Sequence, residues 1–181
     1  RDFYLGMFER VALSVLIDSD WTDTACFCRG EPHPERISEE RTQEIWRESI
    51  AHFKDYRNHL TDSAEKSPLN EYRDEISELC FQAAKEERNL YRLTVPTGAG
   101  KTFSSLRFAL CHAQKYRKKH IIYVAPYNSI LEQNAEDIRR AVGKQEFVLE
   151  HHCNIFYEDE SRESAYKRLT ENWDSPFILT S

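Results

Sequence analysis

The feature that most constrains the fold is a short glycine-containing loop, which lies between an apolar run and a stretch with helical periodicity. The loop consists of Pro96, Thr97, Gly98, Ala99, Gly100, Lys101 and Thr102. Its glycines let the backbone approach an anion closely, and the N–H groups at a helix N-terminus attract negative charge. In loops of this kind the lysine reaches the terminal phosphates of a nucleotide, and the following hydroxyl can ligate magnesium. The pattern therefore predicts a strand, a nucleotide-binding loop and a helix in succession, with Lys101 and Thr102 in the catalytic roles.

Short apolar runs alternate with helix-like stretches from residue 93 onward, which predicts a parallel sheet wound with helices. The predicted strands cover residues 93–95, 121–125, 147–149 and 177–180. The predicted helices cover residues 102–116 and 129–142, and Gly143 is typical of a helix stop. This part of the chain is therefore expected to have the α/β fold class.

The apolar patterns before residue 92 are all helical. An almost wholly apolar stretch, Met7 to Ile17, predicts a helix buried on several sides, which ends where acidic residues begin. Ser38 is a typical cap for a second helix through about Leu60, and Pro68 fits the first position of a third. The polar residues between the second and third helices predict a domain boundary near residue 61.

Composition limits the location of the protein and its partners. No apolar run approaches the roughly 20 residues that span a bilayer, and the first residues lack the plan of a signal peptide. A cytoplasmic location without membrane association is therefore expected. The net charge of −6 gives no overall basic field, so any contact with nucleic acid must be local. One basic cluster at residues 115–120 fits a solvated connector as well as a phosphate contact.

The cysteines indicate neither a disulfide framework nor a strong metal site. There are five of them at irregular spacing, which favours reduced thiols. Cys26 and Cys28, with His33 nearby, suggest a metal clip only weakly, because zinc sites usually use two pairs at wider spacing. The cysteines are therefore expected to be unreactive.

Two segments resemble superfamily 2 helicases. The common phosphate loop has a glycine where this chain has Val95, whereas Pro-Thr-Gly-x-Gly-Lys-Thr resembles the variant that superfamily 2 helicases use. The next predicted strand leads into Tyr127, Asn128 and Ser129, which resemble motif Ia, a helix start that holds one nucleic-acid strand by its backbone. The alternative for this second segment is an ordinary capped junction between a strand and a helix.

The order of the motifs resembles one family in particular, the type I CRISPR-associated fusion of an HD nuclease with a superfamily 2 helicase. The segments that carry the resemblance are LTVPTGAGKT at 93–102, FALCHA at 108–113, IYVAPYNSILEQ at 122–133, LEHH at 149–152 and NWDSPFILTS at 172–181. The resemblance implies that residues 92–181 begin the first RecA-like lobe, that residues 61–91 are a linker and connecting helix, and that residues 1–60 end the HD domain. It also implies ATP and Mg²⁺ as cofactors, single-stranded DNA and an RNA-guided CRISPR surveillance complex as partners, and degradation of foreign DNA as the activity.

The same resemblance assigns a metal ligand near the N-terminus. The stretch LSVLIDSDWTDT at 13–24 resembles the last motif of the HD domain, in which a helix-borne aspartate completes a divalent transition-metal site made mainly of histidines. Asp20 follows a small residue on an apolar helix and is the predicted ligand, with Asp18 as the alternative. The other ligands are expected upstream, and an Asp-Glu box and a second lobe are expected beyond Ser181. The fragment alone is therefore expected to be inactive.

Two other interpretations stay open. In one, the chain is a superfamily 2 helicase without a nuclease, and its N-terminal residues form a helical accessory domain. In the other, it is a non-catalytic nucleotide-binding module. Under every interpretation that includes nucleotide binding, Tyr72 and Arg73, on the helix before the loop, are candidates for adenine recognition.

Two further pairs of residues resemble functional sites but are not expected to be such sites. Asp159 with Glu160 looks like an Asp-Glu box, but the charged surroundings favour a solvated loop. His151 and His152 are neighbours on a predicted strand, so they face opposite sides and are not expected to share a metal.

Overall fold

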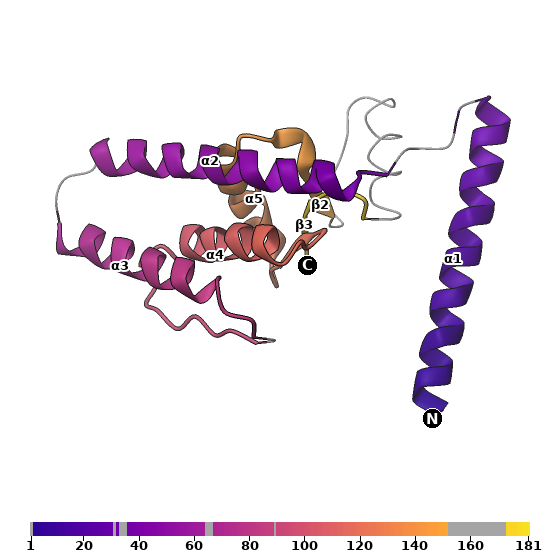
Figure 1. Ribbon diagram of the computed structural model, residues 1–181, viewed down its shortest axis with the longest axis horizontal. Coiled ribbons are helices and arrows are strands. Elements are labelled where there is room, and N and C mark those ends of the chain that lie inside the picture. Colours follow the sequence, from indigo (N-terminus) through magenta and orange to yellow (C-terminus); the bar gives the residue numbers. More distant parts are fainter. Residues whose placement is uncertain (1, 31, 33–35, 64–66, 89, 152–172) are drawn as a thin grey trace. The chain divides into compact units, whose positions relative to one another are not determined.

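The computed structural model describes residues 2–30, 32, 36–63, 67–88, 90–151 and 173–181 (Figure 1). The chain forms two compact units, residues 1–36 and residues 37–181. The first unit contains the helix α1 (Asp2–Arg29), and the second contains every other helix and strand that the structure describes.

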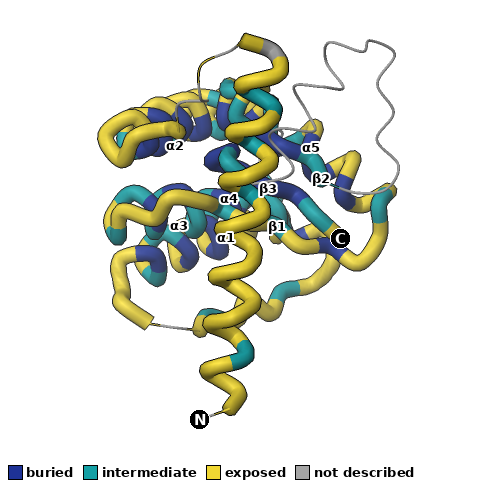
Figure 2. The backbone as a smooth tube through the Cα atoms, turned by 90° about the vertical axis from the view of Figure 1, so that its right-hand side faces the viewer, coloured by how far each residue is buried: buried dark blue, intermediate teal, exposed yellow. Residues whose placement is uncertain are grey.

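Helix α1 is longer and more exposed than the sequence pattern predicts. It continues through Asp18, Asp20 and Asp23 and ends only before Gly30, which has a positive φ of 65°. The predicted end after Ile17 is therefore wrong, because aspartate weakens a helix only slightly whereas glycine readily adopts the left-handed conformation that ends one. The predicted burial is not seen either, since almost all of α1 is exposed (Figure 2). Leu16 and Trp21, for example, are 66% and 65% exposed.

The second unit begins with two long helices whose starts are fixed by side-chain caps. In α2 (Glu39–Ser63), the Ser38 hydroxyl accepts from the Arg41 N–H at 3.1 Å. In α3 (Pro68–Ala83), the Ser67 hydroxyl accepts from the Asn70 N–H at 3.3 Å, and proline occupies the first turn. Both predicted helix starts are confirmed, because such caps depend on residues close in sequence.

The sheet has three parallel strands in the order β1-β3-β2. They are β1 (Ile121–Val124), β2 (Val148–His151) and β3 (Phe177–Thr180), and Phe177 lies in register with both Ile121 and Val148. Helix α4 (Lys101–Lys115) precedes β1, helix α5 (Asn128–Val142) lies between β1 and β2, and a short 3-10 helix, η1 (Gln145–Phe147), directly precedes β2. The α/β fold class is confirmed, and the arrangement is that of an incomplete RecA-like fold.

The predicted strand over residues 93–95 is wrong, because this segment has no strand structure. A strand is held mainly by its hydrogen-bonded neighbours rather than by the propensity of its own residues. Val95 instead packs against a small cluster that contains Ile76, Cys80 and Ala99. The residues before the phosphate loop are therefore positioned by α3 and α4, which lie side by side (Figure 1).

The main core lies between the sheet and the helices α2, α4 and α5. Trp46 of α2 is fully buried at its centre, with its ring edge-on to Phe177 of β3 at 5.0 Å between centroids. Its indole N–H donates to the Lys118 carbonyl at 2.8 Å, so α2 is tied to the segment that follows α4. A cavity of about 160 Å³ remains between α4 and the sheet. The predicted domain limits at residues 60 and 91 stay a prediction.

None of the helices in the described ranges combines the length with the apolar character that crossing a bilayer requires.

Candidate nucleotide-binding site

The phosphate loop folds as a tight turn that leads into α4. The Ala99 N–H donates to the Pro96 carbonyl at 3.3 Å, and Gly98, the third residue of this turn, has a φ of 83°. Gly100 caps the start of α4 with a φ of 80°. Residues with a side chain adopt such φ values only with strain, which is why both positions require glycine.

The first turn of α4 presents a set of backbone donors. Within the part of the chain that the structure describes, the N–H groups of Gly100, Lys101, Thr102 and Phe103 have no acceptor. The first turn contains no acidic residue, and the Lys101 side chain is exposed beside it. Free N–H groups, the positive end of the helix dipole and an ammonium group together favour an anion. The loop residues therefore fit the phosphates of a nucleotide, although the Ala99 N–H is already engaged.

Thr102 takes part in a partly buried series of hydrogen bonds. Its hydroxyl donates to Asn134 Oδ1 at 3.1 Å, and Asn134 Nδ2 donates to the Tyr123 hydroxyl at 3.1 Å. Burial raises the pKa of the Tyr123 phenol above its ordinary value. These two hydrogen bonds connect α4, α5 and β1. Asn134 was not predicted as a site residue, and its signal in the sequence is a polar residue among the apolar positions of α5.

Arg73 of α3 contacts the backbone of the phosphate loop. Its Nε and Nη2 atoms donate to the Gly98 carbonyl at 3.0 and 2.8 Å, and its Nη1 atom donates to Asn70 Oδ1 at 3.1 Å. Adenine recognition by Tyr72 and Arg73 stays a prediction. The structure brings Arg73 to the loop backbone, which the sequence spacing of 25 residues did not indicate.

The predicted nucleic-acid contacts lie at the start of α5, directly after the carboxyl end of β1. Tyr127 caps the helix with an extended backbone, and its carbonyl accepts from the N–H groups of Ile130 and Leu131. Tyr127 and Ser129 are exposed, and Asn128 is partly exposed. These three residues are therefore adjacent and accessible, and a phosphate contact by Tyr127, Asn128 and Ser129 stays a prediction.

The structure does not assemble a metal site around the predicted aspartates. Asp20 is exposed on α1. Asp18 forms an ion pair with Arg36, with 3.7 Å between Oδ2 and Nη2. Residues two apart on a helix point in widely different directions, so these two carboxylates do not converge. Over the described residues, no group of three or more His, Cys, Asp or Glu side chains could hold a metal ion. Asp20, with Asp18 as its alternative, stays a prediction.

The weaker candidates have structural partners or fall outside the described residues. His151 Nδ1 accepts from the Trp173 indole at 2.7 Å, which gives His151 a packing role. His33, His152, Asp159 and Glu160 lie outside the described residues. Burial raises the pKa of the Cys80 and Cys111 thiols, which fits unreactive cysteines.

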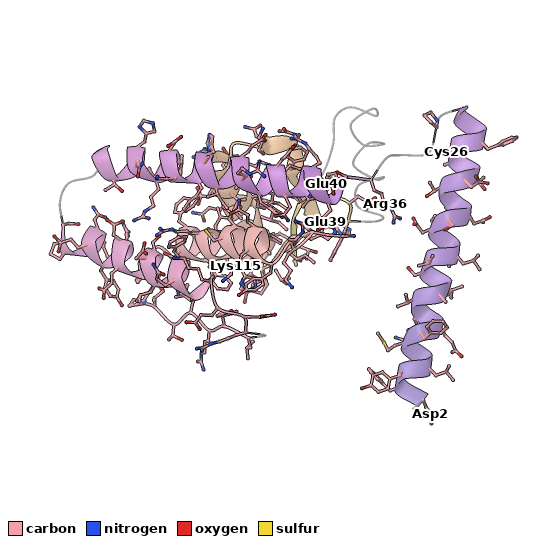
Figure 3. All side chains as sticks on the ribbon, viewed as in Figure 1. Asp2, Cys26, Arg36, Glu39, Glu40 and Lys115 are labelled. Atoms are coloured by element: carbon pink, nitrogen blue, oxygen red, sulfur yellow. The ribbon has the colours of Figure 1, made fainter. Side chains whose placement is uncertain are left out.

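The basic cluster after α4 mainly contacts other parts of the protein. The Lys115 ammonium at the end of α4 (Figure 3) donates to the Lys85 carbonyl. Arg117 forms an ion pair with Glu39 at the start of α2, with 2.5 Å between Nε and Oε1. These contacts favour the interpretation of the cluster as a solvated connector.

Comparison with known proteins identifies the family. A search of curated proteins gave no match. A family model described as type III restriction enzyme, res subunit, matches residues 43–180, which is more than half of the chain and includes the whole phosphate loop. Domains of this family are of the superfamily 2 helicase type, which implies the use of ATP and Mg²⁺ and the binding of nucleic acid. The chain therefore belongs to the family of the type III restriction enzyme res subunit.

Proposed function

We propose that this chain carries the nucleotide-binding part of an ATP-driven motor that moves on single-stranded DNA. The observation that supports this most is the start of α4, where two glycines with positive φ precede four N–H groups without an acceptor among the described residues. Lys101 and Thr102 follow directly. This combination suits the phosphate chain of a nucleotide, because several donors lie next to one another at the positive end of a helix.

Each loop residue has a distinct role in this proposal. The backbone from Pro96 to Gly100 surrounds the phosphates, and the Lys101 ammonium neutralises the terminal ones. The Thr102 hydroxyl ligates Mg²⁺, which, when bound, neutralises charge that develops during phosphoryl transfer. The exposed start of α5 then holds the DNA backbone through Tyr127, Asn128 and Ser129, without reading the base sequence.

The finer assignment is the type I CRISPR-associated nuclease-helicase. It is supported by the order of the motifs between residues 93 and 181 and by the aspartate-containing stretch on α1. Under this assignment Asp20 ligates a divalent transition metal together with residues outside this chain, and an RNA-guided surveillance complex supplies the DNA in the cytoplasm. Residues 1–60 then belong to the HD domain, and residues 92–181 to the first RecA-like lobe.

Lys101→Ala tests the motor assignment. The full chain is titrated with a fluorescent ATP analogue in the presence of Mg²⁺. A charge-assisted contact to phosphate contributes about 1.5–3 kcal/mol, so its loss should weaken binding by roughly tenfold or more. Lys119→Ala is the matched control, because Lys119 is also an exposed lysine but lies beyond the end of α4 that is far from the loop. Equal affinities of Lys101→Ala and wild type would show that the loop does not bind phosphate.

A helicase without a nuclease is the second candidate. It is favoured because the family match starts at residue 43 and therefore does not include α1. The whole protein should distinguish the two. A nuclease predicts metal-dependent degradation of single-stranded DNA that is lost in Asp20→Asn, whereas a motor alone predicts ATP hydrolysis without degradation.

A further inference from the structure

Asn134 is a polar residue within the apolar, inward side of α5. The buried residues of this helix are Leu131, Asn134, Ala135, Ile138, Ala141 and Val142. Asn134 is only 7% exposed. A buried amide is costly unless its oxygen and nitrogen both have partners, whereas leucine at this position would incur no such cost. The bonds to Thr102 and Tyr123 satisfy both atoms, so they account for an amide in this position.

The bond from Thr102 fixes the direction of its hydroxyl hydrogen. A hydroxyl group has one hydrogen and two lone pairs. Because the hydrogen is directed at Asn134 Oδ1, both lone pairs are left for a cation. The Tyr123 hydroxyl accepts from the amide nitrogen and so keeps the amide oxygen turned toward Thr102. The amide therefore holds the Thr102 side chain in one orientation before any ligand binds.

We propose that Asn134 is a positioning residue, which orients the Thr102 hydroxyl as a ligand for the Mg²⁺ of a bound nucleotide. This inference rests on the proposed function, because it requires a nucleotide at the phosphate loop. Asn134 acts on the metal only through Thr102 and does not touch the phosphates. Its loss should therefore weaken nucleotide binding only when Mg²⁺ is present.

The test compares nucleotide affinity with and without the metal. The full chain is titrated with a fluorescent ATP analogue, once with Mg²⁺ and once with EDTA. Asn134→Leu has a similar volume but forms neither hydrogen bond, and it should lower the affinity about fivefold with Mg²⁺, the factor typical of one hydrogen bond. With EDTA its affinity should equal that of the wild type.

Thr102→Val provides the partner variant for a double-mutant cycle. It removes the hydroxyl and should lower the affinity with Mg²⁺ by at least as much as Asn134→Leu. Because Asn134 acts through Thr102, the double variant should bind no more weakly than Thr102→Val alone. Circular dichroism of each variant checks that it is folded. If Asn134→Leu does not fold, Tyr123→Phe takes its place. This variant should lower the nucleotide affinity by a smaller factor, and again only when Mg²⁺ is present.

Two results overturn the proposal while leaving the proposed function intact. One is an equal loss of nucleotide affinity in Asn134→Leu with Mg²⁺ and with EDTA, which would show that Asn134 only supports packing. The other is wild-type affinity of Asn134→Leu under both conditions. In both cases the wild type still binds the analogue and Lys101→Ala still weakens this binding. If instead the wild type does not bind, or Lys101→Ala has no effect, the proposed function fails and the role of Asn134 fails with it.

Discussion

Trp46→Phe should destabilise the second unit by about 2–3 kcal/mol. The change removes the indole N–H that donates to the Lys118 carbonyl at 2.8 Å. The net contribution of one such hydrogen bond to the free energy of unfolding is about 1 kcal/mol. It also leaves a void of roughly 40 Å³ in a fully buried position, which at about 24 cal/mol per Å³ costs about 1 kcal/mol. The lost apolar atoms add on the order of 1 kcal/mol. The edge-on contact with Phe177 partly survives, because phenylalanine keeps one ring.

Equilibrium unfolding of the chain in urea, followed by far-ultraviolet circular dichroism, measures this loss. Fluorescence is less suitable because the variant removes a tryptophan. The matched control is Trp21→Phe on α1, where the side chain is 65% exposed, and its effect should stay below about 0.5 kcal/mol. If Trp46→Phe is as stable as this control, Trp46 does not join α2 to the sheet in the way described.

Two further changes test how the helices are held together. Gly143→Ala should lower the free energy of unfolding by more than about 1 kcal/mol, because Gly143 has a φ of 65° and an added Cβ would overlap the His52 ring. An unchanged urea midpoint would contradict this. Lys144, through a hydrogen bond and its charge, and Arg41 lower the pKa of Glu48 below its ordinary value of 4.5. The folded state is therefore stabilised above pH 4.5, and this contribution disappears as the pH falls through the lowered pKa. Glu48→Gln should accordingly flatten the loss of thermal stability in acid, and a variant as acid-sensitive as the wild type would refute this role.

Features that depend on neighbouring residues could be predicted from the sequence. The starts of α2 and α3 follow from Ser38 and Ser67 with Pro68, and the end of α5 follows from Gly143. The phosphate loop is equally local, because its glycines, lysine and threonine are consecutive. In these cases the structure is decided by contacts within one turn, so the sequence alone carries the information.

Features that depend on distant residues could not be predicted in the same way. Residues 93–95 have the composition of a strand, but no strand among the described residues pairs with them, and Val95 packs against α3 instead. The contacts of Arg73 with Gly98 and of Asn134 with Thr102 span 25 and 32 residues, and no spacing rule indicates them. Both were therefore missed, although both lie directly at the predicted loop.

The turn from Pro96 to Ala99 affects how tightly a nucleotide can appear to bind. A phosphate that takes the Ala99 N–H must first displace the Pro96 carbonyl, and Arg73 favours the existing shape through the Gly98 carbonyl. Only the fraction of molecules with an open turn is then competent, and the observed dissociation constant equals the intrinsic one divided by that fraction. Because the Pro96 carbonyl competes with a phosphate for the Ala99 N–H, the observed affinity for ATP is lower than the contacts with the phosphates alone would give.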